Sequence, residues 1–220
     1  DAAKYAASQA NLPMIAVATN LAHDGIASPV SILEHDGTRS SHGVSVPAAV
    51  LIDLDVVRSG PVRFLRAGIG DVLSNLNAVA DWELAREVNG EEVDGLAASM
   101  SRTAATSLLN HPGTIEDPGF LTTLAEVLVL SGLAMAVAGT SRPCSGACHE
   151  ISHAIDMVLP EKSAPHGEPV HIAPRPSSLR PLHAMQRAIC RGIFAPAQPD
   201  FLAASVRDFL SGAYKRGSST

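Results

Sequence analysis

The segment best suited to metal chemistry is the H-E-x-x-H sequence at residues 149–153. On a helix, its two histidines would lie on one face, one turn apart, and could bind a zinc ion together, with Glu150 as the general base of a metalloprotease. So short a motif also occurs by chance, and its confirmation would be a third ligand downstream. The glycine of the longer H-E-x-x-H-x-x-G-x-x-H motif is absent, because position 156 is Asp. Glu161 and Glu168 remain as candidate third ligands, so the protease stays open as an alternative.

A second combination of residues predicts a different metal site. Asp71 lies in the glycine-rich segment "RAGIGDVLSN", and His166 lies in "APHGEPV", at a helix entrance or in a loop. With His149, they would provide one carboxylate and two imidazoles from separate helices, which is a catalytic divalent-metal site with a position left open for substrate. Structural interpretations exist as well, because a lone Asp is often a helix N-cap and His153 could be a core histidine or support a ligand.

Cysteine content and charge narrow the class of protein. Cys144, Cys148 and Cys190 cannot all pair within one chain, and so few cysteines favour a reducing cytoplasm. Cys144 and Cys148 could be soft metal ligands beside the histidines or small buried thiols. The net charge of −6 and the pI near 5.8 give no case for binding nucleic acid or an anionic membrane.

Hydrophobic patterning predicts a β-containing segment followed by a helical one. The β-containing segment ends near residue 58, where the spacing of apolar residues changes to intervals of three and four. The predicted elements are a helix at 2–10, strands at 14–20 and 48–54 with a two-stranded hairpin around an Asp-Gly turn between them, and helices from 59 to about 159, broken near 110–119.

Two further segments are unusual in composition. Residues 121–139 are apolar enough to suggest a membrane span, but Glu126 and the Ser131-Gly132 pair favour a buried helix. Residues 171–220 hold 7 Lys or Arg, 2 Asp or Glu and five prolines, whereas residues 1–170 hold 9 Lys or Arg and 20 Asp or Glu. The cations of this tail are scattered rather than clustered, which argues against a nucleic-acid or membrane arm.

Several segments that follow one another through residues 1–168 resemble glycerol-1-phosphate dehydrogenases: "DAAKYAA", "HDGIASP", "AGIGDVLSN", "DWELA", "SGLAMAVAGTSRPCSGACHEISHAID" and "HGE". That family belongs to the superfamily of dehydroquinate synthase, glycerol dehydrogenase and iron-containing alcohol dehydrogenases, and "HDGIASP" separates it from the first two. The resemblance implies an α/β plus all-α fold. Residues 1–58 would be the C-terminal part of a Rossmann-like nucleotide-binding domain, 59–170 a helical metal domain, and 171–220 a divergent tail.

The resemblance also implies which residues bind the metal. In that superfamily an acidic residue and two histidines hold a divalent ion, typically zinc, and the matching residues here are Asp71, His149 and His166. His153 would then support the site or relay protons in catalysis. Glu150 matches a variable position, so under this interpretation the H-E-x-x-H match is a coincidence.

The implied reaction is the reversible reduction of dihydroxyacetone phosphate by NAD(P)H to sn-glycerol 1-phosphate, with the metal as a Lewis acid. His23 and Asp24 would lie between the nicotinamide and this small phosphorylated substrate, and Thr19 would contact the cofactor. Arg142 is a candidate for binding the phosphate, with a surface or capping role as the alternative. We expect a cytoplasmic enzyme of phospholipid biosynthesis that neither binds nucleic acid nor spans a membrane; a homo-oligomer is left open.

The sequence departs from the family at both ends. The Gly-Gly-Gly loop that approaches the cofactor pyrophosphate should come just before Asp1, so we expect an N-terminal truncation in which Asp1 and Lys4 are the last cofactor-binding residues. After the His-Gly-Glu segment, Pro169 and the basic tail replace the apolar helices of the family. Two functions therefore remain: a metal-dependent oxidoreductase, and a catalytically inactive relative that binds metal or a partner.

Overall fold

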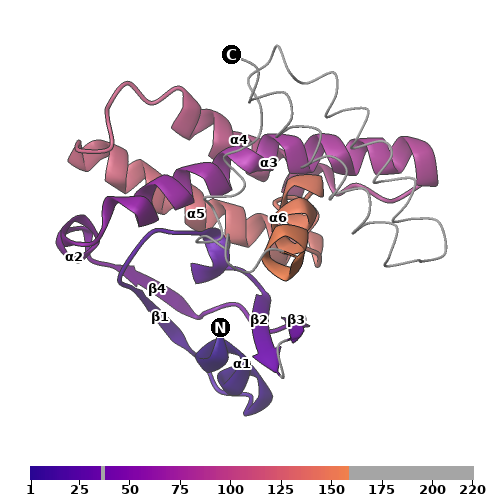
Figure 1. Cartoon of the computed structure of the whole chain (residues 1–220), viewed down its shortest axis with the longest axis horizontal. Coiled ribbons are helices and arrows are strands. Elements are labelled where there is room, and N and C mark those ends of the chain that lie inside the picture. The colour runs from indigo at the N-terminus through magenta and orange to yellow at the C-terminus, as the bar shows by residue number, and fades with distance from the viewer. Residues whose placement is uncertain (36–37, 159–220) are drawn as a thin grey trace.

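The computed structural model describes residues 1–35 and 38–158, and it places an α/β part beside a larger helical part (Figure 1). The α/β part comprises α1 (Ala2–Gln9), β1 (Ile15–Ala18), the short 3-10 helix η1 (Asp24–Ile26), β2 (Val30–His35), β3 (Thr38–Gly43) and β4 (Ala49–Ile52). The helical part comprises α2 (Leu54–Ser59), α3 (Val62–Asn89), α4 (Gly95–Leu109), α5 (Pro118–Ala138) and α6 (Ala147–Val158). The predicted elements up to residue 158 are confirmed in kind and order, whereas the predicted tail at 171–220 lies outside the described residues.

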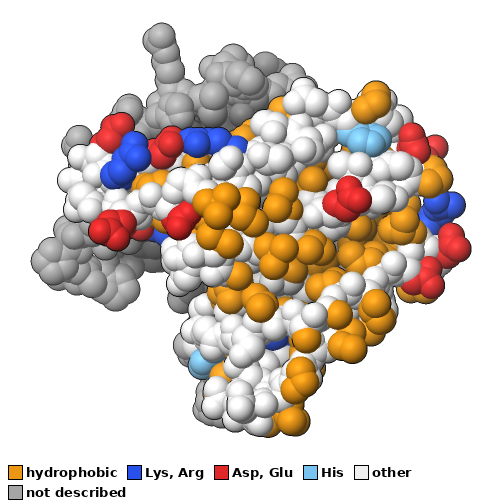
Figure 2. Space-filling view, turned by 180° about the vertical axis from the view of Figure 1, so that it is seen from behind, with side chains coloured by type: hydrophobic (Ala, Val, Ile, Leu, Met, Phe, Trp, Pro, Cys, Tyr) orange, Lys and Arg blue, Asp and Glu red, His pale blue; other side chains and the backbone are white. Residues whose placement is uncertain are grey.

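The described strands form two small sheets. β1 and β4 pair in parallel with Ile15 opposite Ala49, and β2 and β3 form an antiparallel hairpin. One face of the β1–β4 pair is apolar and exposed, because Ile15, Val17 and Leu51 each keep more than half of their surface accessible. Figure 2 shows hydrophobic side chains along this side of the molecule. The other face points inward, where Ile52 packs against the main core.

Local sequence explains where the long helices begin and end. The carboxylates of Asp94 and Asp117 each accept a hydrogen bond of 2.8 Å from a first-turn amide, which caps α4 and α5. Pro118 occupies the first turn of α5, where its missing N–H costs nothing. Gly90 and Gly139 end α3 and α5 with φ of 72° and 65°, a left-handed conformation that glycine adopts without strain.

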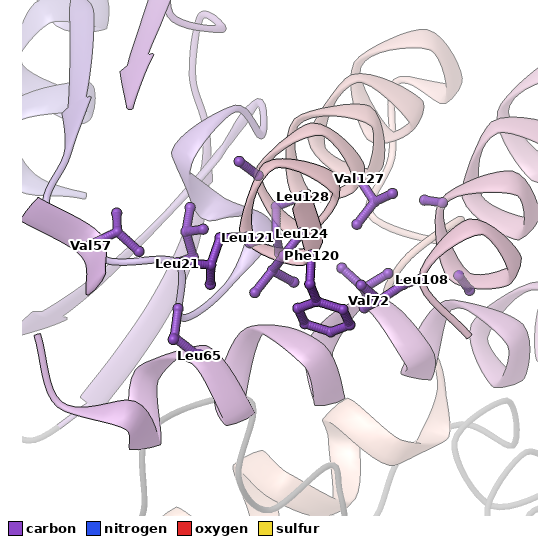
Figure 3. Packing of buried hydrophobic residues seen from close by; sticks show 13 residues of the cluster. Leu21, Val57, Leu65, Val72, Leu108, Phe120, Leu121, Leu124, Val127 and Leu128 are labelled. Atoms are coloured by element: carbon purple, nitrogen blue, oxygen red, sulfur yellow. The ribbon is translucent and has the colours of Figure 1, made fainter. Parts of the chain in front are cut away.

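The main core lies between α3, α4 and α5 and extends to the loop after β1 (Figure 3). Leu21 of that loop is fully buried and packs with the helical residues, so it joins the α/β part to the helices. The labelled members of the cluster are Leu21, Val57, Leu65, Val72, Leu108, Phe120, Leu121, Leu124, Val127 and Leu128.

Helix α5 has the length and composition of a membrane span, with a mean hydropathy of 2.0 over its most apolar window. In the structure 56% of that window is buried, however, and Leu121, Leu124 and Leu128 are core residues. The helix packs against α3, α4 and η1. Its apolar character is therefore accounted for by burial within the fold, as the sequence predicts.

Candidate metal centre

Two of the predicted metal ligands face each other between α3 and α6. Asp71 Oδ1 lies 3.5 Å from His149 Nε2, and the two side chains are only 3% and 8% exposed. Two ligands of a tetrahedral zinc ion, each bonded at about 2.1 Å, are separated by about 3.4 Å. The spacing and the donor types of this pair therefore fit two positions of one zinc coordination sphere.

The third predicted ligand, His166, lies outside the described residues. Within residues 1–35 and 38–158, no group of three His, Cys, Asp or Glu side chains is arranged to hold a metal ion. The described part of the chain thus supplies Asp71 and His149 as a pair. The assignment of all three ligands stays a prediction.

Asp71 is held in place by the loop that follows β1. It lies in the interior of α3, so the N-cap interpretation of this residue is wrong. The backbone amide of Asp24 donates a hydrogen bond of 2.8 Å to Asp71 Oδ2, which leaves Oδ1 to face His149. The α/β part of the fold therefore orients a predicted metal ligand that belongs to the helical part.

His149 lies on α6 between Asp71 and the neighbouring thiol. Its Nε2 atom faces Asp71, and its Nδ1 atom lies 3.6 Å from Cys148 Sγ. Burial alone would lower the pKa of His149, but hydrogen bonds to Asp71 and Cys148 and the charge of Asp71 raise it to about 10. In the metal-free chain the imidazole is therefore protonated at neutral pH, and a metal ion that binds Nε2 displaces that proton.

The predicted substrate residues His23 and Asp24 lie next to this pair. His23 Nδ1 accepts a hydrogen bond of 3.0 Å from the Gly25 amide, and burial, followed by the charge of Lys4, lowers the pKa of His23 despite the charge of Asp71. Burial and the negative charge of Asp71 raise the pKa of Asp24 to about 7. The structure thus brings the half-buried Asp24 together with the buried Asp71 and His149 in one polar cluster.

Two residues of this cluster were not assigned from the sequence. Ser131 of α5 donates a hydrogen bond of 2.8 Å to Asp24 Oδ2, and Asn75 of α3 donates one of 3.0 Å to the Ser131 hydroxyl. Both are fully buried polar side chains. The signal in the sequence that could have found Ser131 is the Ser131-Gly132 interruption of an otherwise apolar helix.

The surroundings of Cys144 and Cys148 do not favour the predicted role of these thiols as soft metal ligands. Cys144 is buried, and burial and the charge of Asp24 raise the pKa of its thiol, which opposes the thiolate form that binds metal. Its Sγ atom lies 3.3 Å from the carbonyl oxygen of Ser131. Cys148 touches Nδ1 of His149, the ring nitrogen that faces away from Asp71. The buried-thiol interpretation therefore fits Cys144.

The three predicted cofactor residues lie in the α/β part. Thr19 is exposed directly after β1, and ligands of parallel α/β sheets bind beyond the carboxyl ends of the strands. Asp1 is exposed before α1, and its Oδ1 atom lies 3.9 Å from Lys4 Nζ. The ammonium of Lys4 is buried and donates hydrogen bonds to the carbonyl oxygens of Gly25 and Ser28 at 2.9 and 3.1 Å. In the structure Lys4 therefore stabilises, by hydrogen bonds, the loop whose Asp24 amide binds Asp71.

Lys4 gives a prediction for the pH dependence of stability. Burial lowers the pKa of Lys4 to about 8, which the charge of Asp24 only partly opposes. Because the unfolded chain then binds more protons between pH 8 and about 10.4, this residue makes the free energy of unfolding rise with pH in that window. The expected rise of wild type relative to Lys4→Met is up to about 1.4 kcal/mol per pH unit, measured by urea unfolding. Parallel pH profiles of the two proteins would contradict it.

His153 and Glu150 have different surroundings on α6. His153 follows His149 by one helical turn and is partly buried, so it shares the face of the helix that carries the ligand. Glu150 is exposed, whereas His149 is buried. A general base of a zinc protease must lie beside the metal. The protease interpretation, which needs Glu150 in this role, stays a prediction.

The guanidinium of Arg142 contacts Glu91, not the predicted metal ligands Asp71 and His149. Its guanidinium forms a two-bond ion pair with Glu91, and Nε lies 2.7 Å from Glu91 Oε1. Glu91 follows the C-terminal end of α3 at Asn89, which lies about 27 Å along the helix from Asp71. A small substrate held at Asp71 does not reach this guanidinium. Arg142 joins the loop before α6 to the end of α3, as the structural alternative expects, and its role in phosphate binding stays a prediction.

Comparisons with known proteins show which proteins the chain resembles. A family model described as iron-containing alcohol dehydrogenase matches residues 1–61. The chain is 43% identical over 175 residues to a glycerol-1-phosphate dehydrogenase (NAD(P)+) of Thermofilum pendens, which covers 78% of this chain and 50% of that protein. It is 41% identical over 171 residues to the enzyme of that name from Pyrococcus furiosus, which covers 76% and 49%. The chain thus spans about half the length of the curated relatives it matches.

Solved structures with a similar fold include dehydrogenases. A glycerol dehydrogenase from Schizosaccharomyces pombe is 25% identical and superimposes with a TM-score of 0.62 over 76% of this chain and 45% of that one. The chain therefore has the mixed α/β and helical fold of this group. Its division into a partial Rossmann-like domain and a helical metal domain stays a prediction.

Proposed function

Because the chain is a homologue of the glycerol-1-phosphate dehydrogenases and matches about half their length, we propose that it is a metal-dependent NAD(P)H oxidoreductase. Its substrate pair is dihydroxyacetone phosphate and sn-glycerol 1-phosphate. The observation that carries the proposal is the buried pair of Asp71 and His149, with Asp24 hydrogen-bonded to the same carboxylate.

The described residues have distinct tasks in this reaction. Asp71 and His149 hold a divalent ion, zinc being the one that best suits a carboxylate and an imidazole, with His166 as the third ligand. The chemistry that a bound ion would supply at this place is Lewis acidity toward a carbonyl oxygen. Asp24 presents Oδ1 to a substrate hydroxyl while Ser131 holds Oδ2. His153, one turn beyond the ligand, is the proposed proton relay.

The cofactor is assigned by position and by the names of the relatives. Those names include NAD(P)+. Thr19 lies at the carboxyl end of β1, and the adjoining loop leads directly to His23 and Asp24, so these residues would hold the nicotinamide. Asp1 and Lys4 border the same loop. The free thiols of Cys144 and Cys148 suit the cytoplasm, which we propose as its location.

Purified chain tests the proposal in two steps. We expect zinc to bind and NADH fluorescence to change on addition of the protein, and dihydroxyacetone phosphate then to consume NADH in a reaction that a chelator stops and zinc restores. Zinc binding without any NADH response would support the second function, a catalytically inactive relative. Absence of both zinc and NADH binding would contradict the proposal.

A further inference from the structure

Helix α6 begins without a capping side chain of its own. Gly146 is the residue before its first turn, since the Gly146 carbonyl accepts hydrogen bonds from the amides of His149 and Glu150. The first amides of a helix have no partner within it and are usually satisfied by a side chain at this position. Glycine offers none. The amide of Ala147 is instead satisfied from another helix, by Asp81 of α3, whose Oδ2 atom accepts its hydrogen bond at 2.8 Å.

The contact between Asp81 and α6 is tight and shielded from water. Asp81 is 3% exposed, and the adjacent Ala78 is 1% exposed. A Cβ atom at Gly146 would lie 2.4 Å from Asp81 Oδ2 and 2.8 Å from the Ala78 Cα atom. The glycine therefore lets the backbone approach α3 closely enough for the carboxylate to reach the helix start. A buried negative charge at a helix N-terminus is also favoured by the helix dipole.

This contact bears on the geometry of the metal ligands. Polar contacts join α6 to α3 at Ala147, which binds Asp81, and at His149, which faces Asp71. On α3 these two acidic residues are ten positions apart, about 15 Å along the axis, whereas on α6 their partners are only two positions apart. The position of the helix start therefore sets how far His149 reaches toward Asp71.

We propose that Asp81 is a positioning residue that caps α6 from α3 and thereby holds His149 at the distance from Asp71 that a metal ion requires. Asp81 does not touch the ion. Its effect on zinc depends on the proposed metal site, but its effect on the start of α6 does not. Side chains that orient a ligand in this way typically change metal affinity by about 10- to 100-fold.

Asp81→Ala, Asp81→Asn and Asp94→Ala together test this role. Asp94 is the matched control, because its carboxylate caps α4 at the same 2.8 Å but α4 carries no ligand. We expect Asp81→Ala to lower zinc affinity, measured by chelator competition, about 10- to 100-fold. Asp81→Asn keeps an oxygen that can accept the Ala147 hydrogen bond, so it should stay within a few-fold of wild type. Asp94→Ala should lower stability but leave zinc affinity unchanged.

Hydrogen–deuterium exchange of the metal-free proteins provides the second measurement. We expect Asp81→Ala to speed exchange of the first-turn amides of α6 while α4 stays as in wild type. Unchanged exchange in α6 would overturn the inference, whether or not wild type binds zinc. Unchanged zinc affinity in Asp81→Ala, or an equal loss in Asp94→Ala, would overturn it as well. A wild type that binds no zinc but shows the exchange effect would contradict the proposed function and leave the capping role of Asp81 standing.

Discussion

Replacing His149 with alanine is expected to lower the affinity of the chain for zinc by about two orders of magnitude. Protein zinc sites with four ligands bind with apparent free energies of about 10–16 kcal/mol at neutral pH, so one ligand contributes on the order of 3 kcal/mol, a factor of about 100. The substitution also leaves the buried carboxylate of Asp71 facing a cavity instead of an imidazole. Competition with a chelator, together with the zinc content of the purified proteins, measures the loss.

Three other variants separate the interpretations of this site. Asp71→Ala should lose zinc as His149→Ala does, because the two residues face each other at 3.5 Å. Glu150→Ala is the matched control from the same helix, and its exposed side chain should not matter. His153→Ala should largely keep the metal. Loss of zinc with both histidines and indifference to Asp71 would favour the protease ligand set and contradict the site proposed here.

Replacing Gly68 with alanine is the second change with a large expected effect, this time on the fold. A Cβ atom at position 68 would lie 1.9 Å from the carbonyl oxygen of Leu21 and 3.0 Å from its carbonyl carbon. Both are backbone atoms, so the clash cannot be relieved by a rotamer change. Overpacking of this kind typically costs about 1–3 kcal/mol and occasionally more, and we expect the upper end here. The midpoint of urea unfolding measures the loss.

Gly95→Ala is the matched control for this prediction. Gly95 is also a helical glycine, the first residue of α4, but a Cβ atom there would meet nothing within 4 Å. Alanine is favoured over glycine in helices by up to about 1 kcal/mol, so this variant should be neutral or slightly more stable. An unfolding midpoint of Gly68→Ala equal to that of Gly95→Ala would show that α3 does not need its close approach to the loop after β1.

The two predictions are linked through that loop. Gly68 lets α3 lie against Leu21, and three residues further along the chain the amide of Asp24 reaches Asp71 on the same helix. Gly132 of α5 makes a similar approach from the other side, because a Cβ atom there would lie 2.7 Å from the Ala27 carbonyl carbon. We therefore expect Gly68→Ala to weaken zinc binding in addition to stability.

The sequence by itself determined much of the local structure. The 3.6-residue spacing of apolar positions predicted helices from residue 59, and the alternation around the Asp-Gly pair predicted the hairpin, because both patterns follow from local backbone geometry. Residue type predicted a chemistry too: a carboxylate and imidazoles among apolar neighbours indicated a metal site, which stays a prediction, and the structure brings Asp71 and His149 together. The identities of these two residues required no knowledge of the fold.

Only the tertiary structure decided which residues share the site and which do not. Asp81, Ser131 and Asn75 act through contacts that span 56 to 107 positions of the chain, and no local pattern encodes such contacts. Arg142 had the right chemistry for phosphate, but the length of α3 separates its partner Glu91 from Asp71. Periodicity specifies the face of one helix, whereas a site requires the relative position of several helices, and that position is set by packing at close contacts such as Gly68 and Gly146.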